Sequence, residues 1–280
     1  MGRVRVVTDS TAELPASVAK ELDIAVIPLH IHIGRETFRD GLEMDSEMLA
    51  RKLQKTDTLP SASAPPLELF ESTYERLGQN NDDIVSIHVS SRLSRTVELA
   101  RRAANSLIGQ RRIMVVDSLS TSLALRTLAI AAGEVSRKGA DLEEVVRLAR
   151  AMIPHVYLVF FVESLKYLER GERIGKAEAL LGTMLSIKPL LIIEDGEILP
   201  LEKVRTRSGG IDKLYEFVTE FPHLEKIAVL RGANATEPSE LMERLQAAYP
   251  KKDIDLVTYG PVLSTHLGPD AIGVFVYEGL

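Results

Sequence analysis

Residues 4–11 read Val-Arg-Val-Val-Thr-Asp-Ser-Thr, an apolar strand-like run that ends in a loop of hydroxyl and carboxyl side chains. Similar runs recur along the chain and alternate with amphipathic helical stretches, a pattern typical of strand-helix-strand units with mainly parallel sheets. Because most of the runs are continuously apolar, we expect helices to cover both faces of the strands. The predicted strands are residues 4–8, 25–29, 84–89, 113–116, 156–162, 187–193, 227–230, 254–259 and 271–277.

The helix-rich stretch 121–152 separates two sets of predicted strands. A chain of 280 residues is near the upper limit for one hydrophobic core. We therefore expect two α/β lobes with a broad interface, a mainly parallel N-terminal lobe (1–155) and a smaller C-terminal lobe (156–280). In the second lobe, Asp195-Gly196 lies between two apolar runs and predicts a β-hairpin.

The composition is typical of a globular protein, with 45% hydrophobic and 26% charged residues. No stretch approaches the ~20 apolar residues that cross a bilayer, and the first residues lack the pattern of a secretory signal. We therefore expect a soluble, cytoplasmic protein. The absence of Cys excludes thiolate metal sites and cysteine nucleophiles, and the net charge of -6 disfavours a general nucleic-acid binder.

Three of the predicted strands end in hydroxyl-rich loops. The carboxyl ends of parallel strands meet at one edge of a sheet, so we expect these loops to converge and form a binding crevice. Taken singly, Ser10 and Ser122 are better interpreted as ordinary helix N-caps. The three loops are Thr8–Thr11, Ser90–Thr96 and Asp117–Ser122.

Two further loops have constrained backbones. The loop 59–66 sets serines among prolines, and the loop 260–269 places His266 between two Gly-Pro pairs. His30 and His32 share one face of a strand that we expect to be half exposed. No carboxylate pattern joins these two histidines, so we assign no metal site.

Several catalytic and nucleotide-binding motifs are missing from the sequence. It contains no Gly-x-Ser-x-Gly elbow, no His-Glu-x-x-His zinc pair and no Gly-x-Gly-x-x-Gly loop. The run Gly171–Lys176 has too short a glycine spacing for a phosphate loop, and Ala177 stands where a metal-binding hydroxyl would be. We expect no cofactor.

Taken in order, five motifs resemble the DegV family, whose members resemble the fatty-acid-binding subunit of bacterial fatty acid kinase. The resemblance spans essentially the whole chain. It implies that the two α/β lobes together form one DegV domain, with a long-chain fatty acid buried between them and its carboxylate contacting hydroxyls and a histidine. The motifs are Val7–Thr11, Ser90–Thr96, Val115–Ser118, segments between Leu165 and Pro189, and His266 with Gly268-Pro269.

The resemblance also assigns the contacts to the fatty acid. It makes Ser94 the carboxylate-binding serine and His266 the histidine near the head group. Family members usually read Thr-Ser-Gln-Pro where this chain reads Ala62-Ser63-Ala64-Pro65. The threonine hydroxyl is therefore absent, which leaves Ser63 or Ser61 to supply the remaining donor.

Three residues replace a glycine that is usual in the family: Arg95, Glu172 and Asp270. We expect the cation at Arg95 to change the mouth of the pocket or the surface that meets a partner. Hydroxyls and a histidine would offset the desolvation of a buried carboxylate. The apolar stretches 160–168 and 180–191 are expected to line the acyl chain, and ordinary core packing is the alternative for them.

The resemblance implies that the protein presents its fatty acid to a separate ATP-dependent kinase, which forms an acyl phosphate for phospholipid synthesis. This chain itself would be non-catalytic. Arg173 and Arg205 would then dock the kinase, although a solvated face with ordinary ion pairs explains them equally well. The resemblance also allows transient contact with a membrane.

Two other functions are alternatives to presenting a fatty acid to a kinase. A fatty acid carrier or sensor without a kinase partner would use the same pocket. A serine hydrolase that uses Ser94 and His266 is disfavoured, because a nucleophile elbow and an orienting acid are missing.

Overall fold

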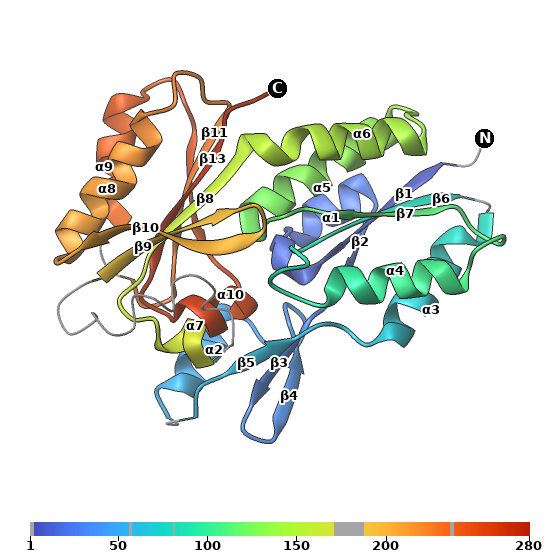
Figure 1. The fold of residues 1–280 in the computed structure, drawn as a ribbon, viewed down its shortest axis with the longest axis horizontal. Coiled ribbons are helices and arrows are strands. Elements are labelled where there is room, and N and C mark those ends of the chain that lie inside the picture. Colours follow the sequence, from blue (N-terminus) through green and yellow to red (C-terminus); the bar gives the residue numbers. More distant parts are fainter. Residues whose placement is uncertain (1–2, 56–57, 81, 171–187, 236–237) are drawn as a thin grey trace.

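The computed structural model describes residues 3–55, 58–80, 82–170, 188–235 and 238–280, and these residues form three β-sheets (Figure 1). The first sheet is parallel throughout, as predicted for the N-terminal half. Its strands are, in order, β2 (Ile24–Ile27), β1 (Val4–Asp9), β6 (Asp83–His88) and β7 (Ile113–Asp117).

Helices cover both faces of the parallel sheet, which confirms the expectation from its apolar runs. Alternate side chains of a strand point to opposite faces, so Val7 packs with α3 (Leu67–Leu77) and α4 (Thr96–Ser106), while Val6 packs with the opposite helices. These opposite helices are α5 (Ser122–Arg137) and α6 (Leu142–Met152), and α1 (Ala16–Leu22) packs on α5. The Asp141 and Glu144 side chains form a capping box that begins α6.

The second sheet is mixed. Its strands are, in order, β10 (Glu197–Val204), β9 (Lys188–Glu194), β8 (Val156–Phe161), β13 (Ile272–Tyr277), β11 (Lys226–Arg231) and β12 (Ile254–Thr258). All neighbouring pairs are antiparallel except β11 with β12, so the prediction of mainly parallel sheets is wrong for this half of the chain. The error arises because an apolar run indicates that both faces of a strand are covered and does not indicate strand direction. Here α8 (Arg207–Thr219) and α9 (Pro238–Ala248) cover one face, and α5 contacts the other.

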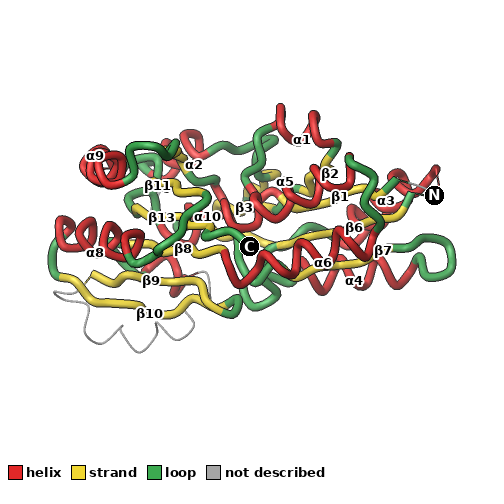
Figure 2. Tube along the Cα trace, turned by 90° about the horizontal axis from the view of Figure 1, so that it is seen from above, coloured by secondary structure: helices red, strands yellow, loops and turns green. Residues whose placement is uncertain are grey.

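One hydrophobic cluster joins the two larger sheets. It contains Val85 of the parallel sheet, Leu128 of α5, and Phe160 and Phe275 of the mixed sheet. Figure 2 shows the two sheets next to each other along the long axis of the molecule. The halves therefore share apolar packing, and the division of the chain at residue 155 stays a prediction.

The predicted hairpin at Asp195-Gly196 is confirmed. Both residues have positive φ angles, 49° and 82°, which a tight turn between β9 and β10 requires. The turn packs against the parallel half, where the Ser90 hydroxyl donates to the Gly196 carbonyl at 2.8 Å. A Cβ atom at Gly196 would lie 2.4 Å from Ser90 Oγ, so this contact also needs glycine.

A third, small sheet was only partly predicted. Its strands are, in order, β4 (Glu36–Arg39), β3 (His30–Ile33) and β5 (Ser61–Ser63), and α2 (Ser46–Leu53) packs beside it. The half-exposed strand at His30 and His32 is confirmed, because Ile31 and Ile33 are buried on its other face. The loop prediction for 59–66 is wrong at β5, since a three-residue strand beside prolines has no pattern of its own.

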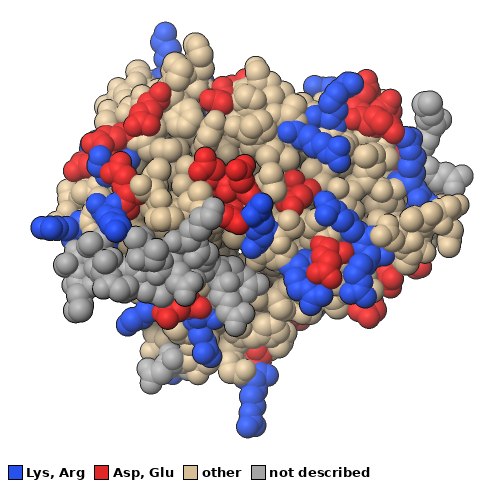
Figure 3. All heavy atoms as spheres, viewed as in Figure 1, with Lys and Arg blue, Asp and Glu red and all other residues tan. Residues whose placement is uncertain are grey.

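Short helices complete the described part of the chain. They are α7 (Lys166–Arg170), α10 (Pro261–Leu267) and the 3-10 turns η1 (Ser10–Ala12), η2 (Gly78–Asn80) and η3 (Ile153–His155). None of the described helices combines the length and apolar character that a membrane crossing requires. On the face drawn in Figure 3, acidic and basic side chains are interspersed.

Candidate ligand-binding cavity

A partly open cavity lies where the carboxyl ends of the parallel strands face the mixed sheet and α10. About 680 Å³ of space lies between its wall atoms, and this volume includes solvent at the mouth. Most of the wall is apolar. Its described residues are Thr11, Leu29, Ala62, Ser63, Val89, Leu93, Ser94, Thr121, Phe160, Leu191, Ile192, Ile193, Ile198, Val262, Leu263, His266 and Leu267.

The three hydroxyl-rich loops converge at this cavity, as predicted. Each contributes one hydroxyl side chain to the wall: Thr11, Ser94 and Thr121. Parallel strands bring these residues together although the chain separates them widely.

Of the two stretches expected to line the acyl chain, 160–168 and 180–191, the described residues in the wall are Phe160 and Leu191. The prediction is wrong for residues such as Leu165 and Leu168, which pack in the hydrophobic core as the alternative had it. Residues 180–187 lie outside the described residues.

Ser94 lies in the loop before α4 and is half buried. Its Oγ lies 2.8 Å from Thr96 Oγ1 and accepts a hydrogen bond from the Thr96 amide at 3.3 Å. Arg95 is largely exposed and pairs with Glu98 at 3.0 Å. Arg95 is not among the described lining residues, and its expected effect on the mouth or on a partner surface stays a prediction.

The strand β5 brings Ala62 and Ser63 to the cavity, whereas Ser61 is not among the described residues of the wall. Ser63 Oγ lies 2.8 Å from His32 Nε2, and His32 Nδ1 lies 3.0 Å from Thr37 Oγ1. Burial, and secondly the neighbouring His30, lower the pKa of His32. Ser63 is thus part of a polar chain within the small sheet.

The helix α10 carries His266 to the cavity, and the N-terminal half holds the start of this helix. Glu13 accepts a hydrogen bond from the Gly260 amide, and the Ser46 hydroxyl donates to the Tyr259 carbonyl at 2.7 Å. The Asp40 side chain lies near the Val262 amide. These contacts place His266 opposite the hydroxyl loops.

Burial raises the pKa values of the two carboxyl groups that hold α10. The pKa of Asp40 rises to about 7, because burial outweighs its hydrogen bonds to Ser10 and to the Val262 amide, and nearby Glu13 and Asp9 add repulsion. Burial also raises the pKa of Glu13, against the opposing effects of the Gly260 amide, Arg126 and Ser122. This end of the cavity is therefore backed by carboxyl groups.

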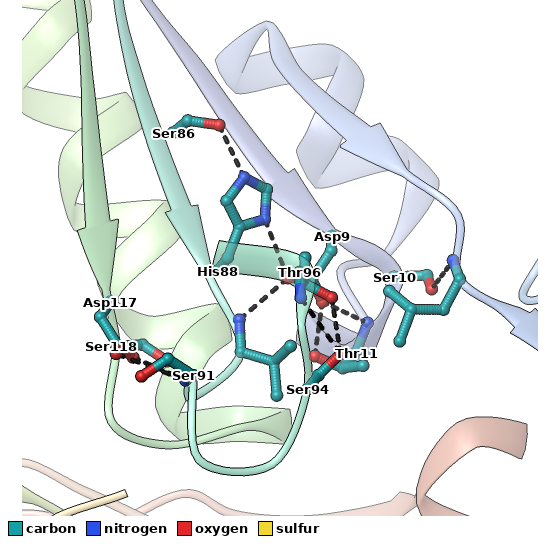
Figure 4. Close-up of polar contacts among 12 residues, drawn as sticks. Asp9, Ser10, Thr11, Ser86, His88, Ser91, Ser94, Thr96, Asp117 and Ser118 are labelled. Atoms are coloured by element: carbon teal, nitrogen blue, oxygen red, sulfur yellow. Dashed lines mark hydrogen bonds and ion pairs between the residues drawn. The ribbon is translucent and has the colours of Figure 1, made fainter. Parts of the chain in front are cut away.

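Behind the hydroxyl loops, a hydrogen-bonded chain links β1, β6 and α3. Figure 4 shows its members Asp9, His88 and Ser86. Asp9 Oδ2 lies 2.9 Å from His88 Nδ1, His88 Nε2 lies 2.7 Å from Ser86 Oγ, and Tyr74 donates to Ser86 at 2.8 Å. The order Ser-His-Asp resembles a hydrolase triad. However, Ser86 is fully buried and is not among the described cavity residues, so the chain is closed to a substrate.

This chain was not predicted from the sequence. A signal for it exists: Ser86 and His88 interrupt the apolar run of a strand that is buried on both faces. Two polar residues at this spacing point to the same face and need a buried partner. Asp9 supplies that partner from the neighbouring strand.

The interpretation of Ser10 and Ser122 as helix caps is wrong. Ser10 Oγ accepts a hydrogen bond from the Leu29 amide at 3.0 Å, and the Ser122 hydroxyl donates to Glu13 at 2.8 Å. Both hydroxyls thus join separate elements around the cavity. Sequence position alone could not distinguish this use from capping, because the same hydroxyl serves both purposes.

Of the two residues expected to dock the kinase, the structure describes only Arg205. Arg205 is exposed between β10 and α8. Arg173 lies outside the described residues. Nearby Arg207 pairs with Glu163 at 2.7 Å and is partly buried.

These features define a class of protein: an α/β fold of two larger sheets and one small sheet around a mainly apolar cavity, with hydroxyls and a histidine in the wall. A family model described as "Uncharacterised protein, DegV family" matches residues 3–279. The chain therefore belongs to the DegV family.

Relatives and solved structures match over nearly the full length. A DegV domain-containing protein of Streptomyces coelicolor is 38% identical over 277 residues, which are 98% of each chain. The crystal structure of Bacillus subtilis DegV, described as a fatty acid binding protein, has a TM-score of 0.89 at 31% identity and covers 99% of this chain and 100% of its own. A Thermus thermophilus structure, described as "Fatty Acid Binding of a DegV family Protein", has a TM-score of 0.88 at 29% identity with the same coverage. The expected DegV-type fold is confirmed.

Proposed function

We propose that this protein binds one long-chain fatty acid in the cavity, with the acyl chain on the apolar wall and the carboxyl group at the hydroxyls. The observation that carries the proposal is the composition of the wall. Apart from Thr11, Ser63, Ser94, Thr121 and His266, its described residues are all apolar. Similar proteins are described as fatty acid binding.

The acyl chain supplies most of the affinity in this proposal. Burial of one methylene group contributes ~0.8 kcal/mol, so a chain of about sixteen carbons gains on the order of 10 kcal/mol before the cost of ordering. The polar residues orient the ligand rather than hold it. Ser94 and His266 are the principal head-group contacts, and Thr11 and Thr121 add hydroxyls that the resemblance did not assign.

A direct test is mass spectrometry of the organic extract from protein purified without detergent. We expect close to one long-chain fatty acid per chain. We also expect Ser94→Ala to weaken binding of added hexadecanoic acid about tenfold, because one hydrogen bond to a charged or polar head group contributes ~1–1.5 kcal/mol.

Ser91→Ala is the matched control, since Ser91 lies in the same loop but is exposed and is not among the described cavity residues. This variant should bind like the wild type. Protein that contains no lipid and does not bind added hexadecanoic acid would refute the proposal.

We propose further that the bound carboxyl group is presented to a separate ATP-dependent kinase, and that this chain contributes no catalytic group. Supporting this, the exposed Arg205 offers a cation that an acidic partner surface can pair with. The sequence lacks a nucleotide-binding loop, which also fits presentation of the ligand's carboxyl group to a separate enzyme that binds ATP.

Arg205→Glu tests this second step. At limiting kinase concentration we expect at least tenfold slower formation of acyl phosphate, because a repulsive charge replaces an attractive one, while fatty acid binding stays at the wild-type level. Arg150→Glu, an equally exposed change on α6, should have the wild-type rate. Equal rates for both variants would exclude Arg205 from the docking surface.

A further inference from the structure

The carboxylate of Asp9 lies directly behind the polar wall of the cavity (Figure 4). Both of its oxygens accept backbone hydrogen bonds, Oδ1 from the Thr11 amide at 3.0 Å and Oδ2 from the Val89 amide at 2.9 Å. Oδ1 also accepts from the Thr11 hydroxyl at 2.6 Å, and Oδ2 contacts His88 Nδ1. Each oxygen of Asp9 therefore accepts at least one backbone hydrogen bond, which fixes the position of the carboxyl group.

The chain behind Asp9 positions its carboxyl group. Tyr74 donates to Ser86, Ser86 Oγ lies 2.7 Å from His88 Nε2, and His88 Nδ1 lies 2.9 Å from Asp9 Oδ2. With His88 on one oxygen and Thr11 on the other, Asp9 is held in one orientation behind the cavity wall.

The hydrogen bond to Asp9 also determines whether the Thr11 hydroxyl can donate or accept a hydrogen bond toward a ligand. A threonine hydroxyl has one proton, and here that proton is directed to Asp9. Toward a ligand, Thr11 Oγ1 can therefore only accept a hydrogen bond. A ligand atom bonded to it would lie within about 5.5 Å of Asp9 Oδ1, because a second hydrogen bond adds about 2.8 Å.

Two more carboxyl groups lie near this end of the cavity. Glu13 accepts from the Gly260 amide at the start of α10, and Asp40 is repelled by both Glu13 and Asp9. The cation Arg126 donates to the Ala12 and Glu13 carbonyls and is not among the described residues of the wall. Neither Lys nor Arg occurs among the described wall residues, where His266 is the one ionisable side chain.

We propose that the cavity holds its fatty acid as the neutral acid, with the carboxyl proton donated to the Thr11 hydroxyl. This inference rests on the proposed function and adds the ionisation state of the ligand. An ionised carboxylate would be repelled by Asp9 and could not accept a hydrogen bond from Thr11, whereas a neutral acid matches the acceptor. Binding of the anion from neutral solution then takes up one proton.

The test is a carbon-13 NMR titration of the complex with [1-13C]hexadecanoic acid between pH 5 and 9. We expect the bound carboxyl group to titrate at pH 7 or above, about 3 units above the ~4.3 of an ordinary alkyl carboxyl group, because burial and like charges both favour the neutral form. A midpoint below pH 7 would overturn the inference and indicate an anion paired with protonated His266. Absence of a bound resonance would instead count against fatty acid binding itself.

A pair of carboxyl-to-amide variants tests the electrostatic origin of the shift. Asp40→Asn removes a nearby charge and should lower the midpoint by about 1 unit. Asp83→Asn, at the opposite end of β6, should leave the midpoint unchanged. Equal midpoints in the wild type and in Asp40→Asn would overturn the assigned role of the buried carboxyl groups. Hexadecanamide, which cannot ionise, should compete with the acid within about tenfold, and failure to compete would also contradict the inference.

Discussion

Asp9→Ala lowers the free energy of unfolding by about 3–5 kcal/mol, as expected when a buried, fully hydrogen-bonded charge is removed. The substitution leaves the Thr11 amide, the Val89 amide and His88 Nδ1 without their acceptor in the interior. Asp9 and His88 are both completely buried, so water cannot replace the lost contacts without rearrangement. Urea unfolding followed by circular dichroism measures the loss.

The matched control for Asp9→Ala is Asp83→Ala, at the start of β6. Asp83 is partly exposed and pairs with Arg112 at 3.2 Å. We expect this change to cost less than about 1 kcal/mol, as for other surface ion pairs. If Asp9→Ala lowers the free energy of unfolding by no more than Asp83→Ala does, the hydrogen bonds of Asp9 do not stabilise the loops at Thr11 and Val89.

Asp40→Asn should stabilise the protein at pH 8 and have little effect at pH 4. In the folded protein the pKa of Asp40 is about 7, against 3.8 for an ordinary Asp. The folded state therefore binds a proton more tightly than the unfolded state, and stability falls as the pH rises from about 4 to about 7. This difference corresponds to on the order of 4 kcal/mol, which the amide removes because it never ionises.

The measurement is urea unfolding of Asp40→Asn and the wild type at pH 4, 6 and 8. The stability advantage of the variant should grow with pH and level off above pH 7. Asp83→Asn, which changes a partly exposed carboxyl group in the same way, should show no such growth. A constant difference between Asp40→Asn and the wild type at all three values would contradict the raised pKa.

The parallel sheet and the hairpin between β9 and β10 were predicted closely because their signals are local. The strands β1, β6 and β7 lie within one residue of the predicted bounds, and the hairpin at Asp195-Gly196 forms as expected. In each case a continuous apolar run or a turn pair is contained in a few adjacent residues. The small sheet was predicted less well, because its strands are three or four residues long and β5 contains only Ser-Ala-Ser.

The candidate site was predicted in part. Convergence of the hydroxyl loops followed from strand topology, and the resemblance pointed to Ser94 and His266, which the structure brings to one cavity. The chain from Asp9 through His88 to Ser86 was missed, because its members come from strands nearly 80 residues apart. Only the register of β1 against β6 brings them into contact.

By itself, the sequence determined the longer strands of the two larger sheets, and that hydroxyl loops meet at one end of a parallel sheet. Both properties depend on periodicity and on neighbouring residues. The tertiary structure alone decided the strand directions of the mixed sheet, the pairing of Asp9 with His88, and the burial that raises the pKa of Asp40. Hydrogen-bond direction and desolvation depend on which atoms surround a group in three dimensions. The spacing of residues along the chain does not indicate which atoms these are.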